Sequence, residues 1–153
     1  MQEDEFYTFR EYMKREENTL TASMEDYLEM IYRLCAHTPY TRINELAAAL
    51  NVQPPSATKM VQKLSDLNLI DYRKYGIITL TEKGQQIGKA LLKRHEIIKE
   101  FLSLIGITDS ILEETEKIEH TISDETLKKL NELVSFFKSN PHIIAMFHNY
   151  KKP

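Results

Sequence analysis

The sequence has few of the residues that build disulfide-linked, sheet-rich or membrane-spanning proteins. It contains a single cysteine, Cys35, so no disulfide can form within the chain, and this favours a reducing compartment such as the cytoplasm. Four glycines among 153 residues leave little material for tight turns between strands. No apolar run approaches the roughly 18–20 residues that span a bilayer. We therefore expect a mainly α-helical, cytoplasmic protein without a membrane segment.

Residues 1–20 are charged throughout and carry several aromatic side chains. They lack the apolar stretch of a secretory signal, so we interpret them as an accessory arm. The remaining chain is long enough for one compact domain or two small ones. We divide it into residues 21–80 and residues 81–153.

The first of these parts begins with three predicted helices. Ser23 and Asp26 resemble a capping box at the start of a helix that ends near Pro39. A short helix over 43–50 is followed after three residues by a helix over 54–67, which begins with two prolines. Two short helices joined by a three-residue turn are typical of a helix-turn-helix.

A hairpin follows the predicted helix-turn-helix. Two short strand-like runs, 69–74 and 77–80, are separated by Tyr75-Gly76, which suits a bend. A helix-turn-helix with a hairpin directly behind it is a winged helix with a two-stranded wing. Helices over about 81–105, 109–121 and 123–138, and a short one near 143–147, then predict an all-helical second domain.

Positive charge is concentrated in one stretch of an acidic chain. Residues 54–94 contain eight Lys and Arg against three Asp and Glu, a local charge of +5 on a chain of net −3. This asymmetry is expected when one face meets nucleic-acid phosphates, although any single lysine is more simply a solvated side chain. The candidate DNA-contacting residues lie on the outer face of the second of the two short helices and on the wing: Pro55, Ser56, Thr58, Lys59, Gln62, Lys63, Arg73, Lys74 and Tyr75.

Acidic and histidine side chains form a second constellation. Glu116, Glu119 and His120 have the spacing i, i+3 and i+4, so on a helix they project from one arc. Two carboxylates of the first helix and a histidine of the long helix complete the candidate set: Asp26, Glu29 and His95. Oxygen-rich donors with imidazole and no thiolate suit Mn²⁺ or Fe²⁺, although Zn²⁺ would bind as well.

Each of these side chains also has an ordinary structural explanation. Asp26 can be the partner in the capping box, Glu29 can pair with Arg33, and His95 can be a core histidine. The spacing of the residues does not establish that their three helices meet. On these grounds alone, the shared metal site remains one of two interpretations.

Four motifs in this order resemble one known family. They are SMEDYLEMIY from Ser23, PSATKMVQKL from Pro55, RHE from Arg94 and IEH from Ile118. The resemblance covers about residues 21–140. It is to the manganese transport regulators, a branch of the diphtheria-toxin-repressor family of metal-dependent transcriptional regulators.

The resemblance implies a homodimer whose winged helix is followed by a helical dimerisation domain, with two Mn²⁺ ions bound per subunit. All six candidate ligands match the ligand positions of the family. Iron-responsive members carry Met in place of Asp26 and Cys in place of Glu116, and a Glu where this chain has Lys99. They usually add an SH3-like domain, which we do not expect here. The long N-terminal arm and the segment after Asn140 depart from the manganese type.

We therefore expect a Mn²⁺-responsive repressor that binds double-stranded operator DNA, controls manganese-uptake genes, and has neither an organic cofactor nor catalytic residues. An iron-responsive or metal-independent winged-helix regulator is the alternative. A di-metal carboxylate enzyme is disfavoured because the paired Glu-x-x-His motifs of ferritin-like sites are missing. Our mechanistic hypothesis is that metal fixes the spacing of the two recognition helices in the dimer.

Overall fold

The computed structural model describes residues 20–150, so nearly all of the predicted N-terminal arm lies outside the described residues. The chain forms two compact units, unit 1 up to Leu92 and unit 2 from Lys93 onward. Helices dominate both, which confirms the mainly helical prediction. Among residues 20–150, no helix combines the length and the hydropathy needed to cross a membrane.

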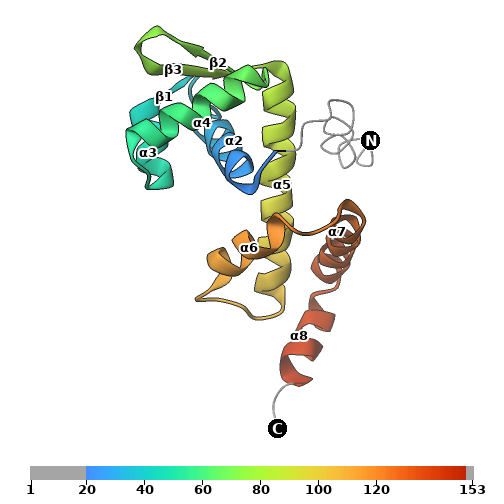
Figure 1. Ribbon diagram of the computed structural model, residues 1–153. Coiled ribbons are helices and arrows are strands. Elements are labelled where there is room, and N and C mark those ends of the chain that lie inside the picture. Colours follow the sequence, from blue (N-terminus) through green and yellow to red (C-terminus); the bar gives the residue numbers. More distant parts are fainter. Residues whose placement is uncertain (1–19, 151–153) are drawn as a thin grey trace. The chain divides into compact units, whose positions relative to one another are not determined.

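Unit 1 contains the predicted helix-turn-helix (Figure 1). Its helices are α2 (Ala22–Leu34), α3 (Ile43–Leu50) and α4 (Pro54–Asp66). Helix α3 ends where Asn51 takes the left-handed conformation, with φ of 54°, and α4 begins with two prolines whose missing N–H groups cost nothing in the first turn. The turn between them is therefore fixed by local chemistry.

The predicted capping box at Ser23 is wrong. Thr21 caps α2 instead, because its backbone is extended and its hydroxyl oxygen accepts a hydrogen bond from the Met24 amide at 3.2 Å. Ser23 is an exposed residue inside the helix. Asp26 therefore lies beyond the capping position, and its role as a capping partner is excluded.

A three-stranded antiparallel sheet forms the wing, with the strand order β1-β3-β2. Its strands are β1 (Thr41–Arg42), β2 (Ile70–Arg73) and β3 (Ile77–Leu80). The predicted hairpin is confirmed, and its tip is the short 3₁₀ turn Lys74–Gly76, in which Tyr75 and Gly76 both have positive φ. Strand β1 was not predicted from the sequence, because two residues are too few to show an alternating pattern.

Helix α5 (Glu82–Leu104) begins in unit 1 and continues into unit 2. Thr81 caps it as predicted, accepting a hydrogen bond from the Gly84 amide at 3.0 Å. A Cβ atom at Gly84 would lie 1.8 Å from the Leu69 carbonyl oxygen, and one at Gly88 would lie 2.7 Å from Tyr32 Cβ. The two glycines thus let the helix pack directly against the hairpin and against α2.

Unit 2 consists of the second half of α5 and three shorter helices, α6 (Ile111–Glu119), α7 (Asp124–Ser139) and α8 (Pro141–Tyr150). Ser123 caps α7 as predicted, and its hydroxyl accepts a hydrogen bond from the Thr126 amide at 3.2 Å. Helix α8 is longer than the short helix expected near residues 143–147. The core of this unit is small: Ile97, Ile98, Leu102, Leu127 and Val134.

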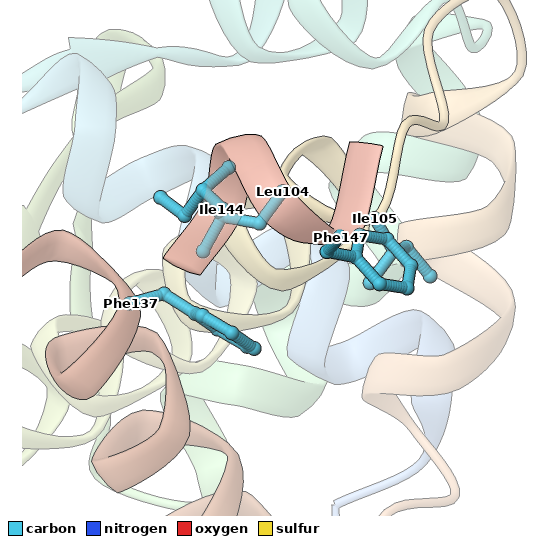
Figure 2. Close-up of a pocket in the computed structure, with 5 residues that line it drawn as sticks. All are labelled: Leu104, Ile105, Phe137, Ile144 and Phe147. Atoms are coloured by element: carbon cyan, nitrogen blue, oxygen red, sulfur yellow. The ribbon is translucent and has the colours of Figure 1, made fainter. Parts of the chain in front are cut away.

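An apolar pocket lies within unit 2, where α5 ends near α8 and the last turn of α7 (Figure 2). Its lining residues are Leu104, Ile105, Phe137, Ile144 and Phe147, and its volume is about 40 Å³. That volume admits a few water-sized molecules, far less than the roughly 300–1,000 Å³ of sites for organic ligands. This pocket therefore offers no room for an organic effector.

Candidate metal centre and nucleic-acid interface

In unit 2, three of the six predicted ligands come together. Glu119, the last residue of α6, is 3% exposed. Its Oε2 lies 2.8 Å from Nδ1 of His95 on α5, and its Oε1 lies 3.6 Å from Nε2 of His120. The carboxylate thus presents one oxygen to each imidazole. His120 is the next residue in the sequence, whereas His95 lies 24 residues before Glu119.

This arrangement fits a divalent transition metal. Two ligand atoms about 2.1 Å from one ion lie about 3.0–3.4 Å apart when the angle between the bonds is near 90–110°. The separations of 2.8 and 3.6 Å bracket that range, so small side-chain movements would suffice. A buried carboxylate is also costly unless it is paired, and here two imidazoles supply its partners.

Glu116 lies one helical turn before Glu119 and is exposed. The other acids of α6 have a different role, since Lys117 Nζ binds Glu113 at 2.9 Å and Glu114 at 3.4 Å. The hydrogen bond from Lys117, with its positive charge, lowers the pKa of Glu113 below its usual value. Glu113 and Glu114 therefore belong to a surface ion-pair cluster, whereas Glu119 lies beside His120.

Helix α2 of unit 1 carries the other two predicted carboxylates. Asp26 is exposed and Glu29 is half-buried, and their i, i+3 spacing places them on one side of the helix. Glu29 binds Arg33 at 2.8 Å, the ion pair considered as its alternative role.

Cys35, at the end of α2, is not suited to be a ligand. Burial, together with the nearby charge of Glu45, raises the pKa of its thiol above the usual value. Metals bind the thiolate, which is the form that both effects disfavour. The donor chemistry of the described residues is therefore oxygen and imidazole nitrogen.

The amphipathic division of α4 agrees with the sequence prediction. Ala57, Val61 and Leu64 are fully buried. The predicted DNA-contacting residues of this helix are all exposed: Pro55, Ser56, Thr58, Lys59, Gln62 and Lys63. Two of these side chains bond within the helix, since Thr58 donates to the Pro54 carbonyl at 3.0 Å and Gln62 donates to Asp66 at 3.3 Å.

The three wing residues also face solvent. Arg73 ends β2, Lys74 begins the turn, and the Tyr75 side chain at the tip is 88% exposed. A tyrosine with a φ of 68° and so much exposed ring surface does not contribute to the core. The exposed face of α4 and the wing tip together give unit 1 a surface that carries Lys59, Lys63, Arg73 and Lys74.

Two arginines near these sites were not singled out from the sequence. Arg94 Nη2 lies 3.5 Å from Nδ1 of His120, on the side opposite Glu119. Arg42 lies on β1, in register with the strands of the wing. Arg94 was noted as part of the basic stretch and of the RHE motif but not as a neighbour of His120, and Arg42 could have been found only if β1 had been predicted.

Comparisons with known proteins identify the family of the chain and describe its two segments. Residues 19–78 match the family model described as "Iron dependent repressor, N-terminal DNA binding domain". Residues 81–147 match the model described as "Iron dependent repressor, metal binding and dimerisation domain". These matches confirm the predicted fold class and the family that the four motifs indicated.

Two curated relatives are named HTH-type transcriptional regulator MntR. The protein of Oceanobacillus iheyensis is 46% identical over 121 residues, which cover 78% of this chain and 82% of the relative. The protein of Geobacillus thermodenitrificans is 41% identical over 133 residues, covering 86% and 94%. A solved structure entitled "Structure of the manganese regulator SloR" is 33% identical with a TM-score of 0.66, covering 74% of this chain. The chain spans about half the length of that structure, 54%.

Proposed function

Because the chain belongs to the iron-dependent, diphtheria-toxin-type repressor family of metal-dependent DNA-binding regulators, we propose that it is a repressor whose DNA affinity is raised by Mn²⁺. The genes that it controls would be those of manganese uptake and homeostasis. Residues 21–80 would read DNA, and residues 81–153 would bind metal and dimerise. It would act in the cytoplasm, where a repressor meets its operator.

The observation that carries the proposal is the buried Glu119 carboxylate between His95 and His120. Such a group needs a positive partner or hydrogen-bond donors, and a divalent cation held between one carboxylate oxygen and the imidazole that faces it would satisfy it. The charge on the cation would also lower the cost of bringing further carboxylates close together. Together with the match of residues 81–147 to a metal-binding domain model, this arrangement supports a role for His95 as a metal ligand.

We propose that the ligands are the six residues indicated by the family resemblance: Asp26, Glu29, His95, Glu116, Glu119 and His120. Six donors exceed the demand of one four-coordinate ion, which supports two ions per subunit with bridging carboxylates. Manganese is favoured over iron by the hard carboxylate oxygens of Asp26 and Glu116, where iron-responsive members carry sulfur ligands. The relative entitled a manganese regulator supports the same choice.

The bound metal would supply positive charge and fixed ligand directions. The chain itself contributes the six ligand side chains, which must come together around the metal. Without a cation, their carboxylates repel one another. Their convergence would select the arrangement in which the recognition helices α4 of two subunits fit the operator together. The switch is then a population shift that depends on the difference in metal affinity between the two arrangements.

The test compares ligand variants with a matched surface variant on the same helix. In Asp26→Ala and Glu116→Ala, the factor by which Mn²⁺ raises the DNA affinity should be at least about tenfold smaller than in the wild type. The fold should be retained. Glu113→Ala, which removes an exposed acid of α6 that binds Lys117, should behave as wild type. Fluorescence anisotropy with a duplex selected by the wild-type protein gives the affinity, and circular dichroism checks the fold. Full Mn²⁺ stimulation in both ligand variants would refute the ligand assignment.

A further inference from the structure

The register of the wing sheet places two arginines in one row. Arg42 on β1 and Arg73 on β2 are both cross-strand partners of Ile77 on β3. Residues directly opposite one another on antiparallel strands project from the same face of a sheet. The two guanidinium groups therefore leave the sheet on the same side.

Burial shows which side this is. In the next row along, Thr41 of β1 and Ile78 of β3 are both 0% exposed, so that row faces the core. Arg42 and Arg73 alternate with that row and are both exposed. The row Arg42–Ile77–Arg73, which we call the arginine row, thus lies on the solvent side of the wing, next to the tip.

The charge around the arginine row is positive. Lys74 follows Arg73 directly, whereas Asp71 lies one outward row farther from the tip, opposite Thr79. Neighbouring strands are about 4.8 Å apart, so the backbones of the two arginines are separated by about 10 Å across β3. Two long side chains starting that far apart can reach separate phosphates of one nucleic-acid backbone.

Arg42 is also held in place by an aromatic ring. Its Cζ atom lies 5.8 Å from the ring centroid of Tyr40, two residues earlier in the chain. This cation–π contact restrains the guanidinium without consuming its N–H donors. A restrained fork that keeps its donors loses less entropy when it binds a phosphate.

We propose that Arg42, acting with Arg73, binds the phosphate backbone of the operator, so that β1 is part of the DNA interface. This inference rests on the proposed function of unit 1 as the DNA reader. Guanidinium forks bind phosphate oxygens in pairs and position a protein on DNA without reading its sequence. The simpler alternative is that Arg42 is a solvated side chain that packs on Tyr40.

The experiment measures the salt dependence of DNA affinity for the full chain in the presence of Mn²⁺. The probes are a labelled duplex selected from a random library by the wild-type protein and an unrelated duplex of equal length. Arg42→Gln removes one phosphate contact from each subunit, so the slope of log K against log salt should fall by about 0.9 per subunit, or about 1.8 for the proposed dimer. The affinity should fall roughly tenfold, and by a similar factor on both duplexes.

Three further variants make this result specific. Arg42→Met removes the charge but keeps an unbranched apolar stem beside Tyr40, so it carries the test if Arg42→Gln is poorly folded. Arg42→Lys should keep the slope and lose part of the affinity, because an ammonium lacks the fork. Lys129→Gln removes an equal charge from the exposed surface of α7 and should leave both quantities unchanged.

Two outcomes would overturn the proposal: a wild-type slope in both charge-removing variants, or a loss confined to the selected duplex. A wild-type protein that fails to bind either duplex with Mn²⁺ would instead refute the proposed function itself. The two failures are therefore distinguishable in the same titrations.

Discussion

The two units of the molecule bury their apolar residues to very different extents. Among residues 20–150, fifteen buried hydrophobic residues form the core of unit 1, whereas five are buried in unit 2. Unit 2 instead exposes most of the large apolar side chains found on the described surface: Leu112, Leu133, Phe136, Met146, Phe147 and Tyr150. Unit 1 thus resembles a self-sufficient domain, and unit 2 resembles one half of an assembly.

This difference matches the separate tasks of the two units. A DNA reader must present a fixed surface, which unit 1 achieves by anchoring α4 through Ala57, Val61 and Leu64. A dimerisation domain must leave apolar surface for a second copy, and unit 2 exposes six large apolar side chains among the described residues. We therefore expect the stability of unit 2 to depend on a partner subunit and on bound metal, and that of unit 1 to depend on its own core.

The largest expected effect separates the two units directly. Leu64→Ala in unit 1 should lower the free energy of unfolding by about 2–5 kcal/mol, because it opens a cavity in a closed core. Leu133→Ala in unit 2, where the side chain is 39% exposed, should cost less than about 1 kcal/mol in dilute protein. Urea unfolding followed by circular dichroism measures both. Equal losses would remove the distinction between the units.

Two glycines sharpen the comparison at a smaller scale. Gly84→Ala should destabilise unit 1 by about 1–3 kcal/mol or more, because the added methyl group meets the Leu69 carbonyl. At Gly106 in unit 2, an added Cβ atom would have no other atom within 4 Å. Gly106→Ala should therefore cost only the backbone strain of a φ of 99°, about 1 kcal/mol. Thermal unfolding of the two variants should rank them in this order. A more damaging Gly106→Ala would contradict the tight packing of α5 in unit 1.

Helix caps should give the smallest effect and one that is equal in the two units. Thr21→Ala and Ser123→Ala each remove a hydroxyl that accepts a hydrogen bond from a first-turn amide, at a cost of about 1 kcal/mol. Ser23→Ala, which removes only an exposed hydroxyl inside α2, should change stability by less than about 0.5 kcal/mol. Differential scanning calorimetry resolves these steps. A larger loss at Ser23 than at Thr21 would restore the capping box predicted from the sequence.

The sequence predicted the helices and the hairpin well because their signals are local. Two prolines start α4, Ser123 starts α7, and the apolar positions of α4 repeat with the helical period. The start of α2 was misplaced because two hydroxyl residues compete there, and spacing alone did not identify Thr21 as the cap. Strand β1 was missed because it exists only through its pairing with β3.

The candidate metal centre was predictable only in part, because some of its contacts depend on how distant segments pack. Glu119 and His120 are neighbours, so their proximity follows from the sequence. The approach of His95 depends on how α5 packs against α6, which no pattern of residues encodes locally. The arginine row is the clearest case, because Arg42 and Arg73 are 31 positions apart and only the register of three strands brings them into line.

The most direct test of the central claim is the DNA affinity of the wild-type protein titrated in parallel with Mn²⁺, Fe²⁺, Zn²⁺, Co²⁺ and a chelator. Fluorescence anisotropy with the selected duplex supplies the affinities at constant salt. We predict that Mn²⁺ raises the affinity roughly 5- to 150-fold over the chelated protein. An affinity that is the same with chelator and with saturating Mn²⁺ would contradict a metal-switched repressor.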